Sequence, residues 1–288
     1  MKVKYLILFA AGLLVLNVFA WQEVFKLNNP EYLQVYFFSV GQGDSQFIET
    51  PQGHQILIDG GPNSLVLEKL NKIMPFWDKT IDMVILTHPE KDHMSGLLDV
   101  LERYKVDYFI WTGVIKNNAE NKILAEILED LKEKPDSIKI INAYAGIKIK
   151  AGDAQMEIIY PLENLVGQEI KDANNTSIVG RLAYRENSFL FTGDISSVIE
   201  KKLAGLYNLK SDVLKVAHHG SKYSTSDLFL RAVKPNIAII GVGKNSYGHP
   251  TQEVLNRLMN FGSKIFRTDI DGDVKILSNG RELFFENK

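Results

Sequence analysis

The chain is 288 residues long, with 45% hydrophobic and 24% charged residues, which is the balance of an ordinary globular protein. Its formal net charge is −2, so no overall basic field indicates a nucleic-acid-binding protein. It contains no cysteine, which excludes disulfide bonds and thiolate metal sites. Any metal must therefore be bound by histidine and carboxylate side chains.

Residues 1–21 have the pattern of a targeting segment. Two early lysines precede an apolar run from Tyr5 to Trp21. Such a run after a short basic start indicates a signal peptide or an N-terminal membrane anchor. A buried helix of the domain is the alternative. Either export interpretation makes the protein extracytoplasmic, secreted or anchored to the cytoplasmic membrane through residues 5–21, with residues 22–30 as a linker.

From residue 31 onward the chain alternates short apolar runs with turn signals and helical periodicity. Strands are predicted over 33–40, 46–50, 55–58, 83–86, 108–111, 138–141, 147–150, 155–160, 177–184, 188–191, 213–217, 237–242, 264–268, 273–277 and 282–285. Helices are predicted over 65–74, 96–104, 117–134, 196–206, 226–233 and 251–260. This order indicates an α/β (α+β) protein with two mixed sheets and outer helices. Since no linker divides residues 31–288, we expect one domain.

The segment from Thr87 to His93 concentrates polar side chains in one short turn. It follows the apolar run Met83–Leu86 and contains His88, Glu90 and Asp92 as well as His93. Histidine, aspartate and glutamate are all metal ligands, and a loop can direct several of them inward. A solvated polar loop is the alternative interpretation of this heptapeptide taken alone.

Other candidate ligands also come directly after predicted strands. Asp59 follows 55–58, Asp194 follows 188–191, and His218 and His219 follow 213–217. Asp59 could instead shape a tight turn, and Asp194 could instead cap a helix. Their shared position favours a site, because open α/β sheets place ligand sites at strand ends. With Asp194 as a bridge, one or two divalent metal ions, Zn or Mn, could be bound.

Taken together, these residues resemble the metallo-β-lactamase superfamily, whose H-x-H-x-D-H signature corresponds here to His88-Pro89-Glu90-Lys91-Asp92-His93. The resemblance narrows to the soluble C-terminal domain of ComEC-type competence (DNA-uptake) proteins. It rests on Gly43-Asp44-Ser45, Leu57-Ile58-Asp59-Gly60-Gly61, Thr192-Gly193-Asp194, Lys215-Val216-Ala217-His218-His219-Gly220-Ser221 and Tyr247-Gly248-His249-Pro250. It covers residues 31–288 and implies a four-layer αββα sandwich with the site at the edge between two sheets.

The resemblance also implies roles for individual residues. Asp92 and His93 look like ligands of one metal, which Asp194 and either His218 or His219 complete. His88 and Glu90 look like ligands of the other metal. His249 looks like a late-motif histidine, either a ligand or a group that contacts the leaving group. Asp92, His249 and Lys215 are the residues expected to act in catalysis, Lys215 by holding phosphate oxygens. Asp59 and Asn175 are expected to orient the ligands by hydrogen bonds from behind.

Two departures from the superfamily pattern bear on the metal. Glu90 stands where the signature has its second histidine, and the region of the third-motif histidine reads Asn174-Asn175-Thr176-Ser177. One metal site is therefore rich in oxygen, which favours Mn²⁺ or Mg²⁺ there while Zn²⁺ remains an option. The same departures leave open a single-metal site.

Three functions follow as hypotheses. The first is an exported metal-dependent hydrolase of phosphoesters, most plausibly a DNA nuclease of the competence type, with Lys215, Lys222, Lys244 and Arg267 as candidate phosphate contacts. The second is a cell-surface hydrolase of a small phosphodiester or another ester, which the acidic net charge suits. The third is a non-catalytic scaffold with the same fold. DNA or a small phosphodiester is the expected partner, and no obligate protein partner is inferred.

Overall fold

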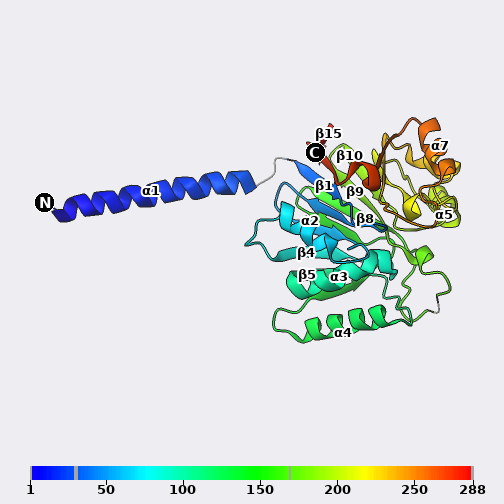
Figure 1. The fold of residues 1–288 in the computed structure, drawn as a ribbon, viewed down its shortest axis with the longest axis horizontal. Helices are drawn as coiled ribbons and strands as arrows, with labels where there is room; N and C mark the ends of the chain where they lie inside the picture. The colour runs from blue at the N-terminus through cyan, green and yellow to red at the C-terminus, as the bar shows by residue number, and fades with distance from the viewer. Residues whose placement is uncertain (1, 29–31, 169, 287–288) are drawn as a thin grey trace.

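The computed structural model describes residues 2–28, 32–168 and 170–286. It consists of a long N-terminal helix and a body in which two sheets are packed face to face (Figure 1). The helix α1 (Lys2–Asn28) projects away from the body. Its segment Val3–Trp21 has a mean hydropathy of 2.1 and is 0% buried, so it is long and apolar enough to span a membrane. The alternative of a buried domain helix is therefore wrong.

The first sheet has the strand order β15-β14-β1-β2-β3-β4-β5-β6. Its strands are β1 (Leu33–Phe37), β2 (Gln46–Glu49), β3 (Gln55–Ile58), β4 (Thr80–Ile85), β5 (Lys105–Trp111), β6 (Lys139–Asn142), β14 (Val274–Ser278) and β15 (Leu283–Glu286). The helices α2 (Leu65–Ile73), α3 (Lys91–Arg103) and α4 (Ala119–Glu133) pack on its outer face (Figure 1).

The second sheet has the order β13-β12-β11-β10-β9-β8-β7. Its strands are β7 (Lys148–Ala151), β8 (Ala154–Tyr160), β9 (Val179–Tyr184), β10 (Asn187–Phe191), β11 (Val213–Lys215), β12 (Ile237–Ile240) and β13 (Lys264–Arg267). The helices α5 (Ser197–Leu206), α6 (Asp227–Val233) and α7 (Gln252–Asn260) cover its outer face. Short helical turns are η1 (Asn174–Thr176), η2 (Ala217–Gly220) and α8 (Thr268–Asp271).

Three apolar layers hold the sandwich together. One lies between the sheets and includes Phe37, Ile58 and Phe191, whereas the other two lie between each sheet and its outer helices. Strands buried on both faces read as continuous apolar runs, such as Ile237–Ile240 with every residue buried. The predicted four-layer αββα sandwich with two mixed sheets is confirmed.

The structure corrects one helix start. The helix predicted over 96–104 begins at Lys91, so Asp92 and His93 lie in its first turn rather than in a loop. Glu90 has an extended backbone before the helix, and the Asp92 carboxylate lies at the positive end of the helix dipole. The apolar periodicity of a helix is interrupted in this turn, because its buried face carries the polar residue His93 beside Met94.

Several predicted strands end earlier than expected; the strand predicted over 33–40, for example, ends at Phe37. The strand predicted over 213–217 ends at Lys215, after which η2 begins, and the strand predicted over 237–242 ends at Ile240. The apolar side chains Val216, Ala217 and Val242 are still buried, which explains why their pattern resembled strand.

Close backbone contact places α3 against the loop after β3. The backbone N–H of Gly60 donates to His93 O at 2.7 Å, and that of Gly96 donates to Gly61 O at 3.0 Å. A Cβ atom at Gly96 would lie 2.0 Å from Gly60 O. Only glycine therefore allows the approach that brings His93 next to Asp59.

We predict that Gly96→Ala lowers the free energy of unfolding by about 1–3 kcal/mol, because the added methyl group overpacks this contact. Chemical denaturation of the purified chain measures the effect. Gly205→Ala in α5 is the matched control, since a Cβ there meets nothing within 4 Å. The control should be neutral or stabilising by about 0.5–1 kcal/mol, and equal effects of both variants would contradict the packing argument.

Candidate metal centre

Asp59 fixes the orientation of two histidines at the site edge. Its Oδ2 atom accepts hydrogen bonds from His93 Nδ1 and Thr87 Oγ1, both at 2.7 Å, and its Oδ1 atom accepts from Thr87 N at 2.8 Å. The Thr87 hydroxyl also lies 3.0 Å from His88 Nδ1. Because that hydroxyl donates its proton to Asp59, it accepts from His88. Both imidazoles thus carry a proton at Nδ1, so Nε2 of each is the atom that can coordinate a cation once it is unprotonated.

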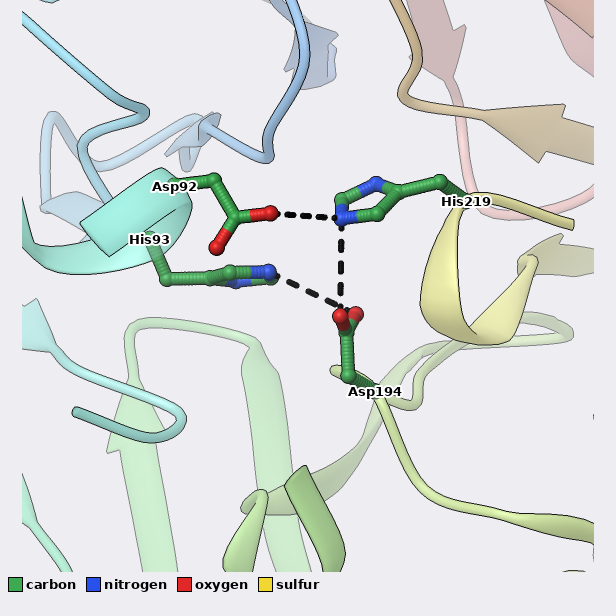
Figure 2. Close-up of side chains that lie close together, drawn as sticks. All are labelled: Asp92, His93, Asp194 and His219. Atoms are coloured by element: carbon green, nitrogen blue, oxygen red, sulfur yellow. Dashed lines mark hydrogen bonds and ion pairs between the residues drawn. The ribbon is translucent and has the colours of Figure 1, made fainter. Parts of the chain in front are cut away.

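Four side chains from three separate segments converge on one small space (Figure 2). Ligand atoms of Asp92, His93, Asp194 and His219 all lie within 4.8 Å of one another. His93 Nε2 is 3.4 Å from Asp194 Oδ1, and His219 Nε2 is 3.4 Å from Asp194 Oδ2 and 3.2 Å from Asp92 Oδ2. The first turn of α3, the end of β10 and η2 supply these groups.

Several buried polar atoms in this cluster have no hydrogen-bond partner among the described residues. They include His88 Nε2, His93 Nε2 and Asp194 Oδ1. His88 Nε2 lies 4.0 Å from Asp194 Oδ2. Unpaired buried polar atoms are costly, so three that face one small space fit a bound cation. Imidazole nitrogen together with carboxylate oxygen is a donor set suited to Zn²⁺ or Mn²⁺.

The two adjacent histidines of η2 occupy different environments. His219 is buried, and its Nδ1 lies 2.7 Å from Gly241 O, which directs Nε2 toward the cluster. His218 has 29% of its side chain exposed, and its Nε2 lies 3.9 Å from Asp194 Oδ2. Both have left-handed backbones, with φ of 50° and 52°. Such strain in non-glycine residues is common at functional sites.

Three other predicted residues lie at the periphery. Glu90 lines the cavity above the cluster, but its Oε1 forms an ion pair with Lys116 Nζ at 2.6 Å, and it is not part of the four-residue group. His249 also lines this cavity, with its ring 5.6 Å from that of His218. Asn175 accepts from the backbone N–H of Ser196 at 3.0 Å, so it braces the loop that carries Asp194.

Lys215 does not lie where a phosphate contact requires it. Its side chain is 2% exposed, and its ammonium group pairs with the Asp44 carboxylate and donates to Val216 O at 2.9 Å. The expected contact of Lys215 with substrate therefore needs correction: the residue lies beneath the site. A charged side chain on a short buried strand finds its counter-ion in the interior.

For Asp44, no role is predicted from the sequence. Its Oδ1 lies 3.5 Å from His219 Nδ1, and its backbone N–H donates to Asp92 O at 3.1 Å. It therefore connects the loop after β1, the start of α3 and η2. A signal was present, because Asp44 follows an apolar run just as Asp59 and Asp194 do.

The buried charges shift pKa values in opposite directions. Burial lowers the pKa of His219, but neighbouring carboxylates, Asp194 first, outweigh burial and raise it to about 10. Burial also opposes protonation of His93, yet Asp194 and Asp59 hold its pKa well above the usual value. Burial, followed by the charge of His93, lowers the pKa of His88 to about 3. Without a cation, two imidazoles of the cluster thus carry protons at neutral pH.

A cavity of about 290 Å³ opens directly over the cluster. Three of the residues that line it, Gln42, Asn174 and Tyr247, were not predicted from the sequence to belong to the site. The full lining consists of Gln42, Glu90, Asp92, Asn174, Asp194, His218, His219, Tyr247 and His249. This lining contains no lysine or arginine among the described residues. The volume accommodates a small group, such as one phosphodiester with its flanking atoms.

The two packed sheets, the outer helices and this cluster of histidines and carboxylates are those of the αββα metallo-hydrolase fold. The family model of the metallo-beta-lactamase superfamily matches residues 39–244, more than half of the chain. The chain belongs to the metallo-β-lactamase superfamily.

Curated relatives narrow the comparison to ComEC-type competence proteins. ComE operon protein 3 of Bacillus subtilis is 30% identical over 262 residues, which are 84% of this chain and 32% of that protein. Competence protein ComA of Neisseria gonorrhoeae is 30% identical over 245 residues, covering 83% of this chain and 31% of that protein. The chain thus spans about a third of the length of these relatives.

Solved structures share the fold at low identity. The metallo-beta-lactamase fold protein YhfI from Bacillus subtilis has a TM-score of 0.57 and 12% identity, over 84% of this chain and 99% of that one. Igni18, a metallo hydrolase from the archaeon Ignicoccus hospitalis, has a TM-score of 0.53 and 16% identity, over 84% and 98%. At such identities the likeness extends to the fold alone.

We predict that Asp59→Asn weakens divalent metal binding about 10–100-fold, because the amide no longer fixes the Nδ1 protons of His93 and, through Thr87, of His88. Titration with Zn²⁺ or Mn²⁺ under competition with a chelator measures the affinity. Asp130→Asn, on the exposed face of α4, is the matched control and should bind as the unchanged protein does. Equal affinities of the two variants would contradict the orienting role.

Metal binding should release protons and strengthen as pH rises. Because His93 and His219 have raised pKa values, both are charged near pH 7 without metal, and each must lose a proton before it can coordinate. Calorimetry at pH 7 in buffers of different ionisation enthalpy should report release of about two protons per ion. Binding without proton release would show that these imidazoles are already neutral.

Proposed function

We propose that this protein is an exported metal-dependent phosphodiesterase whose substrate is DNA. The observation that carries the proposal is the convergence of His88 Nε2, His93 Nε2 and Asp194 Oδ1, buried and without hydrogen-bond partners, beneath an open cavity. Nitrogen and oxygen donors of this kind suit a divalent ion that acts as a Lewis acid on an ester.

Asp92, His93, Asp194 and His219 would hold one divalent ion, and His88 lies next to Asp194 for a second. A bound ion of this type acidifies a coordinated water and stabilises negative charge on the substrate. Asp92 is the ligand closest to the solvent side, with a third of its side chain exposed, whereas His93 and Asp194 are buried. Its carboxylate can therefore accept a hydrogen bond from an attacking water.

His249 and His218 line the same cavity as Asp92, with their rings 5.6 Å apart, and would contact the leaving group. The pKa of His249 is lowered, first by burial and then by the neighbouring histidines, so the ring is neutral near pH 7. Its buried Nδ1 has no partner among the described residues. A neutral imidazole can donate a hydrogen bond to a phosphate oxygen from one ring nitrogen, which positions the ester for attack.

DNA is the favoured substrate because two of the relatives carry names that refer to competence and recombination. In addition to the two described, Recombination protein 2 of Haemophilus influenzae is 30% identical over 87% of this chain and 29% of that protein. The exposed side chains of Lys222 and Lys244 follow site segments and can contact neighbouring phosphates. Export rests on α1, which has the length of a signal or anchor segment.

A small phosphodiester is the second candidate. The cavity lining holds no lysine or arginine among the described residues, and Arg267 is engaged by Asp269 at 2.7 Å and 3.0 Å. A polyanion gains affinity from several phosphate contacts, whereas a small ester needs few. The lining therefore favours a small ester that fits within the cavity over a polyanion that extends beyond it.

The test uses the full chain in detergent, stripped with chelator and resupplied with Mn²⁺ or Zn²⁺. Linear single- and double-stranded DNA and bis(p-nitrophenyl) phosphate are the substrates. We expect metal-dependent DNA cleavage that Asp194→Asn reduces by at least about 100-fold, because it removes a carboxylate that lies within 4.0 Å of four histidines. The control Asp130→Asn should retain full activity.

Each outcome separates the candidates. Cleavage of the chromogenic ester with intact DNA would replace the nuclease by the small-phosphodiester hydrolase. No turnover of any substrate by a metal-loaded protein would favour a non-catalytic scaffold. DNA cleavage that Asp194→Asn leaves unchanged would point to a contaminating nuclease and overturn the proposal.

A further inference from the structure

An exposed aromatic pair lies on the loop between α2 and β4. Phe76 is 82% exposed and Trp77 is 59% exposed, and their rings contact each other edge to face at 4.8 Å between centroids. Phe76 has the largest exposed fraction of all the large apolar side chains in the part of the chain that the structure describes. Removing the two rings from water would be favourable, since aromatic side chains bury a large apolar area.

Strand directions place this loop at the end of the sandwich where the chain arrives from α1. β1 starts at Leu33 and runs antiparallel to β2, which runs antiparallel to β3, and β3 is parallel to β4. The starts of β1, β3 and β4 therefore lie at one end of the first sheet. We call it the anchor end; Figure 1 shows the α2–β4 loop on the side from which α1 leaves.

The metal centre lies at the opposite end. Asp59 and His88 follow the last residues of β3 and β4, and Asp194 follows the last residue of β10. The second sheet has the same orientation, because Asn187, at the start of β10, accepts from Ser278 Oγ at 2.6 Å, and Ser278 pairs with Leu33. The aromatic pair and the metal centre are therefore separated by the length of the strands, from one end of the sandwich to the other.

The length of the tether limits how far the anchor end can lie from a membrane that holds α1. Gln22–Asn28 adds about 10 Å as helix beyond Trp21, and the steps from Asn28 to Leu33 span at most about 18 Å. The anchor end is thus the part of the body closest to the bilayer surface. Aromatic residues are enriched at that depth, where one part of the ring system is apolar and another meets water.

We propose that Phe76 and Trp77 insert into the lipid headgroup region and hold the body upright on the membrane. The metal centre then faces away from the bilayer, open to substrate in the surrounding medium. A second pair supports a lipid-facing end: Tyr32 and Phe284, 5.9 Å apart edge to face, lie by the start of β1 and near the start of β15.

The absence of cysteine from the chain allows a direct test by single-site labelling. Phe76→Cys, Leu14→Cys in α1 and Val198→Cys at the start of α5 are each labelled with an environment-sensitive fluorophore. The full chains are reconstituted, with chelator present, into phosphatidylcholine–phosphatidylglycerol vesicles, with or without bromine on the acyl chains. Val198 is the matched control, because it is 71% exposed and follows β10 at the site end.

Bromine should quench the probes at Phe76→Cys and Leu14→Cys and leave the probe at Val198→Cys unchanged. Adding Trp77→Ser to Phe76→Cys should reduce the quenching, because the remaining aromatic anchor is lost. Quenching at position 14 alone, at all three positions or at none would overturn the proposal. The proposal would also be overturned if Trp77→Ser left the quenching at position 76 unchanged, because the short tether to α1 would then explain that quenching. These outcomes are independent of catalysis.

Discussion

The carboxylate of Asp59 is the interaction on which the site depends. One buried group accepts hydrogen bonds from the Thr87 backbone, the Thr87 hydroxyl and His93, and the hydroxyl passes the constraint on to His88. These bonds hold the Nδ1 proton of both imidazoles and direct the Nε2 atom of each toward Asp194. Burial raises the pKa of Asp59, and the bonds from His93 and Thr87 oppose that rise.

The site exists only where the two halves of the sandwich meet. The first sheet supplies Asp59, His88 and the start of α3, and the second supplies Asp194 and His219. The buried ion pair of Asp44 with Lys215 crosses the same boundary. The cost of desolvating the two charges is offset only when the two sheets pack in the native arrangement, because each charge then has its partner. Formation of the ligand set is thus linked to folding of the whole body.

The sequence predicted the layers and most ligand positions for one physical reason. Apolar runs mark strands buried on both faces, and polar residues just after them must lie at the sheet edge, as Asp59, Asp194 and His219 do. It misplaced the start of α3, because a buried histidine breaks the apolar period. It predicted the wrong contact for Lys215 and no role for Asp44, since the partner of a buried charge comes from a distant segment. It also left His218 and His219 equivalent, whereas the structure buries His219 and places its Nδ1 against the Gly241 carbonyl.

The central claim, that the converging imidazoles and carboxylates form a metal centre, is tested most directly by elemental analysis of the purified full chain. The account predicts at least one divalent transition-metal ion per chain, and a loss of that ion in Asp194→Asn but not in Asp130→Asn. A chain that purifies without metal, binds none on titration and unfolds at the same temperature with and without chelator would contradict it.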